Sequence, residues 1–300
     1  MQPRAPWYLK PGRDIWRRPI LSLSSFALLF ALMVGLPTGG MAGPGDLLVS
    51  PVRVVMEGRD RSAELTLVNR SDETATYRIT VENRRMREDG SFEEIQQARS
   101  DELLAEELVR YAPRRITLQP GTPQTIRLLL RKPRDLAEGE YRSHLMFRAV
   151  PDEQAGTTLA QEEEDNDGIS IRLIPIYGIT IPVIVRHGDL QADVAVTDAR
   201  LGMATSGSER PVLAVTLERS GARSVYGDIT ITAASSDASD ATVLAQIRGI
   251  AVYAPNARRV LEIPLDDAAF ARISGQEVDV AFSEVSGQSD RVSAQNRFQM

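Results

Sequence analysis

The chain has 300 residues, 42% of them hydrophobic and 25% charged, a composition typical of a globular protein long enough for two domains. Its formal net charge is −6, and after position 42 it carries 30 basic and 40 acidic residues. This acidic balance argues against nucleic acid as a partner, because nucleic-acid binding requires a basic face. The absence of cysteine excludes disulfides, thiolate metal sites and a cysteine nucleophile.

The N-terminal segment has the organisation of a secretory signal. Arg17 and Arg18 precede the apolar run ILSLSSFALLFALMVGL and a Pro-Gly break, and Gly40 and Ala42 supply the small residues that a signal peptidase requires. We therefore expect residues 1–42 to be a signal peptide, cleaved after Ala42, and the remaining chain to be exported and soluble. The apolar run is slightly long, so an uncleaved N-terminal anchor is the alternative.

The next segment, DLLVSPVRVVMEG (residues 46–58), is typical of an opening β-strand. We expect four of its side chains to be buried: Val49, Pro51, Val54 and Met56. Arg53 stands in the middle of this apolar run. It either faces solvent as an ordinary strand residue or provides a fixed charge for a negatively charged partner.

Short segments of alternating polar and apolar residues, separated by turn signals, continue to Pro151. They cover residues 63–69, 75–83, 114–121, 123–133 and 139–151. Strands of this length and spacing, rich in Val, Ile, Thr and Tyr, predict an all-β sandwich. One or two helical turns are expected within residues 100–113, where Ser100 could cap a helix and Pro113 would end it.

Residues 151–168 interrupt this pattern with an acidic run, Glu162–Asp167. A calcium-binding loop requires acids at alternate positions, a glycine and a distal glutamate. A contiguous acidic block is instead typical of a solvated loop, and we prefer that interpretation.

The longest β-like stretch follows, ISIRLIPIYGITIPVIVRHG (residues 169–188), and both of its faces are largely apolar. At period two, Ile169, Ile171 and Leu173 share one face. Pro175 and Pro182 each remove a backbone donor, so this strand is expected at a sheet edge or to be broken.

A second β domain is predicted beyond a short linker. Alternation resumes in residues 193–202, 211–221, 224–234, 242–255, 258–265 and 277–287. We therefore divide the mature chain into a first domain (43–186), a linker (187–190) and a second domain (191–300), and assign both domains to the all-β class.

The sequence offers little catalytic chemistry. His144 and His187 are the only histidines, and Ser143 and His144 are strand neighbours that point to opposite faces. No phosphate-binding loop or nucleophile elbow is present in the sequence. We predict a binding protein with no enzymatic activity, no catalytic residue, no cofactor and no metal.

The order of LTLVN, APRRITLQPG, GEY…FRAVP and the long apolar strand resembles the PapD-like periplasmic chaperones of fimbrial (pilus) assembly. The resemblance covers roughly residues 47–186, and extends loosely into the second domain through RSGARSVYGD and AVYAPNARRV. It implies two immunoglobulin-like β-sandwich domains in an L-shaped arrangement, a periplasmic location and a divergent branch of that family.

The resemblance also implies a function, donor-strand complementation, in which the chaperone lends a strand to a pilus subunit whose own sandwich is incomplete. It implies delivery of that subunit to an outer-membrane usher. Ile169, Ile171 and Leu173 would then be the donor-strand residues, unless they serve the core of their own sandwich. An exposed donor edge would also permit self-association.

Arg53, within RVVMEG, matches the position of the family arginine that binds the C-terminal carboxylate of the subunit. The lysine that assists this arginine in the family is replaced here by Thr180, and Met146 replaces a usual asparagine. Arg172 and Arg186 are the alternative second cations.

An exported structural or adhesive immunoglobulin-like protein of the cell surface is the alternative function. A structural sandwich has no need of a long strand that is apolar on both faces, and this feature favours the chaperone.

Overall fold

The computed structural model describes residues 46–151, 176–204, 210–234, 242–286 and 289–300. The predicted signal peptide, the acidic run and the predicted donor-strand residues Ile169, Ile171 and Leu173 lie outside these ranges. Within these ranges, no helix is both long and apolar enough to cross a membrane.

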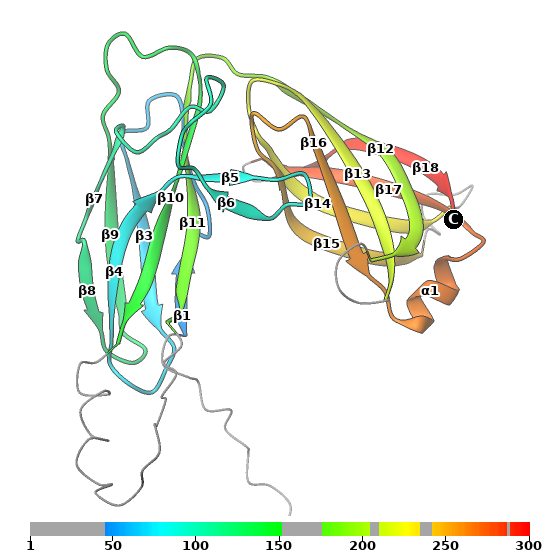
Figure 1. Cartoon of the computed structure of the whole chain (residues 1–300), viewed down its shortest axis with the longest axis horizontal. Coiled ribbons are helices and arrows are strands. Elements are labelled where there is room, and N and C mark those ends of the chain that lie inside the picture. Colours follow the sequence, from blue (N-terminus) through cyan, green and yellow to red (C-terminus); the bar gives the residue numbers. More distant parts are fainter. Residues whose placement is uncertain (1–45, 152–175, 205–209, 235–241, 287–288) are drawn as a thin grey trace, which may run out of the picture. The chain divides into compact units, whose positions relative to one another are not determined.

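Two sheets form the first sandwich, one of four strands in the order β1-β3-β9-β7 and one of five in the order β2-β11-β10-β4-β8 (Figure 1). The strands are β1 (Leu47–Ser50), β2 (Val54–Met56), β3 (Ser62–Asn69), β4 (Ala75–Glu82), β7 (Val109–Ala112), β8 (Arg115–Leu118), β9 (Pro123–Leu130), β10 (Gly139–Val150) and β11 (Gly178–His187). Alternate residues of both sheets, such as Leu65, Leu67, Ile126 and Phe147, are fully buried in a shared core.

The segment expected to form one opening strand is divided between the two sheets. β1 pairs with β3 in the four-stranded sheet, whereas β2 pairs in parallel with β11 in the five-stranded sheet. Val49, Val54 and Met56 are buried as expected, but the expectation for Pro51 was wrong, because Pro51 is exposed where the chain crosses between the sheets.

Within residues 100–113 one helical turn is present, at Ala105–Val109, and the residues after it form a strand. Val109 N donates to Ala105 O at 3.2 Å, and β7 begins at Val109. Upstream, Leu103 O accepts from Arg142 N of β10 at 2.8 Å. A backbone bond to a distant strand has thus taken the place of the local bonds that a longer helix would need.

The second sandwich also has two sheets, of orders β12-β13-β16 and β15-β14-β17-β18. Its elements are β12 (Ala192–Met203), β13 (Pro211–Gly221), β14 (Val225–Ala233), β15 (Val243–Val252), β16 (Arg258–Pro264), α1 (Asp267–Ile273), β17 (Glu277–Ser286) and β18 (Ser289–Gln299). The all-β prediction is confirmed for both sandwiches. The short helix α1 was not predicted, although Asp266 caps it by accepting from Ala269 N at 2.6 Å.

A small hairpin, β5 (Arg84–Met86) and β6 (Phe92–Glu94), leaves the first sandwich and contacts the second. Val260 N donates to Glu88 O at 2.7 Å, and Asn256 Nδ2 donates to Met86 O at 2.7 Å. A separate apolar cluster formed by Met86, Ile184, Ala251 and Tyr253 is shared between the two sandwiches.

Candidate functional site

Arg53 directly precedes β2 and lines a cavity of about 750 Å³ formed by both sandwiches. Val54 and Met56 point into the core, so strand alternation turns Arg53 and Val55 to the opposite face of the sheet. The second sandwich contributes Tyr226 to the cavity wall.

The guanidinium of Arg53 makes cation–π contacts with aromatic rings and does not pair with a carboxylate among the described residues. Its Cζ lies 4.5 Å from the ring centroid of Tyr226 and 5.7 Å from that of Tyr253. Its Nε and Nη1 are buried, and neither has a hydrogen-bond partner in the part of the chain that the structure describes. Burial lowers the pKa of Arg53, and the nearby charge of Arg186 acts in the same direction. Arginine nonetheless remains protonated in proteins, so Arg53 presents a charge that no acidic side chain among the described residues pairs with.

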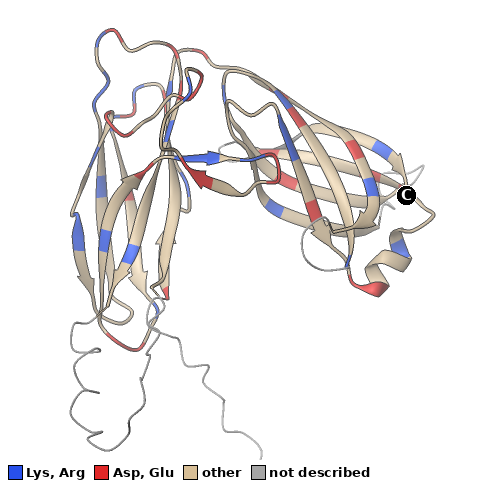
Figure 2. Ribbon diagram, viewed as in Figure 1, with Lys and Arg blue, Asp and Glu red and all other residues tan. Residues whose placement is uncertain are grey.

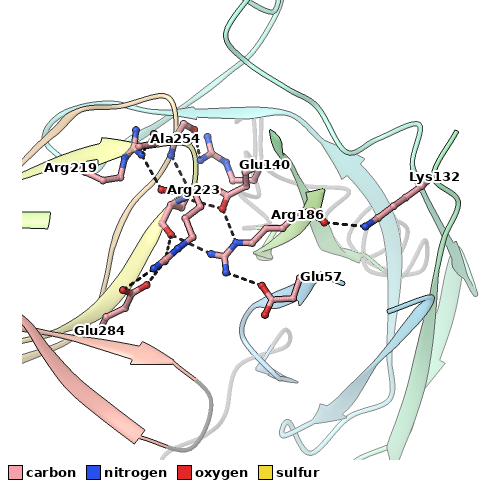
Figure 3. A network of polar contacts seen from close by, with 11 residues as sticks. Glu57, Lys132, Glu140, Arg186, Arg219, Arg223, Ala254 and Glu284 are labelled. Carbon is pink, nitrogen blue, oxygen red and sulfur yellow. Dashed lines mark hydrogen bonds and ion pairs between the residues drawn. The ribbon is translucent and has the colours of Figure 1, made fainter. Parts of the chain in front are cut away.

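Arg186 lines the same cavity, but its donors are already used (Figure 3). Its Nε donates to Glu140 at 3.0 Å, its Nη1 to Glu57 at 3.2 Å and its Nη2 to Ser224 O at 3.2 Å. The Glu140 side chain is 1% exposed and also accepts from Ser224 N at 2.9 Å. Arg186 therefore holds a buried polar network together and is not free to receive a ligand.

Arg223, the third arginine of the cavity, is likewise neutralised by an ion pair with Glu284 (Figure 3). Burial competes with the hydrogen bonds from Arg223 to Glu284, but those bonds dominate and raise the pKa of Arg223. Of the three arginines that line the cavity within the described residues, Arg53 is the one without a carboxylate.

Arg142 of β10 shares the ring of Tyr253, with its Cζ 4.4 Å from the ring centroid. Its Nη1 donates to Ala254 O at 3.1 Å, and burial lowers its pKa. The sequence analysis predicted no role for Arg142, Tyr226 or Tyr253, although the two tyrosines lie within RSGARSVYGD and AVYAPNARRV.

Thr180 does not line the cavity with Arg53. Thr180 and Met146 are opposite each other on β11 and β10, and Thr180 Oγ1 lies 3.5 Å from Met146 Sδ. The two positions at which the sequence departs from the pattern of the chaperones that it resembles are thus in contact with each other. Arg172, the other alternative cation, lies outside the described residues.

The start of β11 has an open edge. β11 pairs with β10 from Gly178 to His187, but β2 covers only Val183–Val185 on its other side. Among the described strands, none pairs with Gly178–Pro182 on that side. The adjoining Ile176 and Tyr177 are 56% and 55% exposed. This edge can accept the backbone of another strand, whereas Ile181, Val183 and Val185 serve the core of their own sandwich.

No protein-family model and no curated protein sequence matches the chain. Its fold is similar to a chain of the CsuC–CsuE chaperone–tip adhesion subunit pre-assembly complex of Acinetobacter baumannii, at 12% identity and a TM-score of 0.44, covering 84% of this chain and 97% of that chain. A structure of the YadV chaperone gives 12% identity, a TM-score of 0.43 and coverage of 84% and 100%. A chain of the Salmonella enterica SafA pilin–SafB chaperone complex gives 13% identity, a TM-score of 0.41 and coverage of 85% and 96%. Chaperones thus recur among the similar structures.

Proposed function

We propose that this protein is a periplasmic chaperone that binds pilus-type subunits by lending them a strand. The observation that carries the proposal is the open edge of β11 at Gly178–Pro182, beside the exposed side chains of Ile176 and Tyr177. An unpaired edge is a hazard for an isolated protein, because it invites pairing with other chains. A protein that binds its partner by β-augmentation requires such an edge.

The donor residues in this proposal are Ile169, Ile171 and Leu173, immediately upstream of that edge in the sequence. Three or four apolar side chains at about 2 kcal/mol each would contribute roughly 6–8 kcal/mol when buried in the groove of a subunit. Association consumes much of this free energy. Main-chain hydrogen bonds along the edge must therefore accompany the apolar contacts.

Arg53 is the proposed anchor for the C-terminal carboxylate of the subunit. It has buried N–H groups without partners among the described residues and lies in an open cavity, whereas Arg186 and Arg223 are already paired. A guanidinium fork binds a carboxylate through two parallel hydrogen bonds. Thr180, which contacts Met146, is not part of this anchor in our proposal.

Co-expression with an exported pilus-type subunit tests the function. We expect the soluble periplasmic level of the subunit to fall when the chaperone is omitted. Unchanged levels of the subunit would contradict the proposal.

The donor strand is tested by Ile171→Thr combined with Leu173→Ser, with Ser170→Ala on the opposite face as the matched control. The double variant should no longer bind the subunit while Ser170→Ala still binds it, and circular dichroism should confirm that both variants are folded. Equal binding by a folded double variant would remove these residues from the donor strand.

An exported structural or adhesive protein remains the second candidate. It would assemble with its own kind or attach to a surface, so its loss would change the fibre or adhesion but leave the solubility of other subunits unchanged. The co-expression experiment therefore separates the two functions. Delivery to an outer-membrane usher belongs to the chaperone proposal, and co-purification of the subunit-loaded chain with that usher would test it.

A further inference from the structure

Three arginines lie directly opposite one another on the outer face of the five-stranded sheet. Arg148 of β10 is the cross-strand partner of Arg78 of β4, and Arg78 is the partner of Arg115 of β8. All three are exposed, and Figure 2 shows the basic positions of these neighbouring strands in blue. We name this set the arginine row. At the usual spacing of strands its backbone positions span roughly 10 Å.

Side chains opposite each other on neighbouring strands come into contact. Two residues away from the row, Thr76 Oγ1 and Thr117 Oγ1 of the cross-strand pair are hydrogen-bonded at 2.9 Å. Like charges in such opposed positions destabilise a sheet. The arginine row therefore carries a repulsion that a bound anion would offset.

Within the described ranges, the row has almost no carboxylate partner. The side chains of Arg78 and Arg115 make no hydrogen bond or ion pair there, and that of Arg148 has only Glu82 at 3.9 Å. By contrast, Arg85 of the neighbouring hairpin is paired with two carboxylates, those of Glu93 and Glu102. The row is thus an exposed multivalent cation whose charges are largely uncompensated.

The connection from β10 to β11 begins and ends beside this row. β10 ends at Val150, two residues after Arg148, and β11 begins at Gly178, which is the cross-strand partner of Arg148. The sequence of this connection contains EEEDND at residues 162–167, with five acids in six residues. About ten residues separate this segment from each strand, and at up to roughly 3.3–3.6 Å per residue they reach well beyond the length of the row.

We propose that the acidic segment Glu162–Asp167 binds the arginine row of its own chain. Guanidinium groups pair with carboxylates in forked geometry, so successive acids can bridge neighbouring arginines and relieve their repulsion. Tethering makes the encounter intramolecular, with an effective concentration in the millimolar range. The contact is ionic and exposed, so it weakens as salt shortens the Debye length.

This contact does not depend on the proposed function. The proposed donor residues Ile169, Ile171 and Leu173 follow the acidic segment in the same connection.

The chain has no cysteine, so a single spin label can be attached at Asn166→Cys without altering any acid. In the chain from residue 43 onward, we expect the label to broaden the amide signals of β4 and β8 near Arg78 and Arg115 at low ionic strength. The broadening should disappear in about 1 M salt, where the Debye length is about 3 Å. It should also disappear in R78Q/R115Q/R148Q but persist in R59Q/R61Q/R131Q, which removes the same charge from exposed arginines outside the row. Absence of broadening at low salt, or equal broadening in both triple variants, would overturn the proposal.

A peptide containing EEEDND provides a second measurement that also identifies the occupant. A variant in which residues 162–167 are replaced by Gly and Ser should bind this peptide in trans at least tenfold more tightly than the intact chain does. Equal affinity for both chains would show that the row accepts acidic partners but that its own segment does not occupy it, which overturns the proposal. No binding to the replacement variant would do so as well. Neither result bears on the binding of pilus-type subunits, so failure here is distinguishable from failure of the proposed function.

Discussion

His144 of β10 predicts a measurable dependence of stability on pH. Its side chain is 3% exposed, its ring meets Phe92 edge-on at 5.5 Å, and within the described structure neither ring nitrogen has a partner. Burial, reinforced by the charges of Arg142 and Arg84, lowers the pKa of His144 to about 3. Replacement His144→Phe retains an aromatic ring and removes the titrating group.

The expected effect follows from linkage between protonation and folding. The unfolded chain binds a proton at His144 with a pKa near 6.5, whereas the folded chain stays neutral down to about pH 3. Stability is therefore complete above about pH 6.5 and is lost as the pH falls toward 3. At pH 5 the difference of about 1.5 pH units from the unfolded pKa corresponds to about 2 kcal/mol.

Urea unfolding at pH 7.5 and pH 5.0, followed by circular dichroism, measures this loss. The wild-type chain should lose about 2 kcal/mol more than His144→Phe between the two pH values, because acids that titrate in both proteins cancel in the comparison. At pH 7.5 the variant should be at least as stable, since it removes two buried nitrogens that have no partner among the described residues. Equal losses in both proteins, or an NMR titration of His144 near pH 6.5 in the folded chain, would refute the reasoning.

Three further predictions concern charge and capping. Arg53→Ala should weaken binding of a peptide that carries the C-terminus of a pilus-type partner about 10- to 150-fold in calorimetry, the equivalent of about 1.5–3 kcal/mol for a charged hydrogen bond. The exposed control Arg127→Ala should leave the affinity unchanged. If the two variants bind an amidated peptide equally well, the group that Arg53 binds is the carboxylate. Glu140→Gln removes the buried partner of Arg186 and should destabilise the chain by about 3–5 kcal/mol in urea unfolding; a loss below about 1 kcal/mol would mean that the network is not stabilising. Asp266→Ala should cost about 1 kcal/mol through loss of the cap of α1, and an unchanged unfolding midpoint would contradict this.

Most strands of the two sandwiches were predictable because one face of the strand lies in a core and the other does not. In β3 and β9, for example, Leu65, Leu67, Ile126 and Leu128 recur at period two and are all fully buried. Such alternation is a local property of the sequence, since successive side chains of a strand point to opposite faces. Helix α1 lies outside this pattern, and its signal in the sequence is the capping residue Asp266.

The candidate site was predictable only in part. The arginine inside RVVMEG was conspicuous because an apolar strand seldom includes a charge, and Arg53 does line a cavity. The sequence could not indicate that Arg186 would form ion pairs with Glu140 and Glu57, or that Arg53 would make a cation–π contact with Tyr226. Those contacts join residues far apart in the chain.

The sequence by itself thus determined the all-β class and most strand positions, and it singled out Arg53 as a charge within an apolar run. Only the tertiary structure decided the division of residues 46–58 between two sheets, the open edge of β11 and the alignment of three arginines across β10, β4 and β8. The physical reason is that alternation fixes which face a side chain takes, whereas pairing register and the packing of distant strands fix which charges become neighbours.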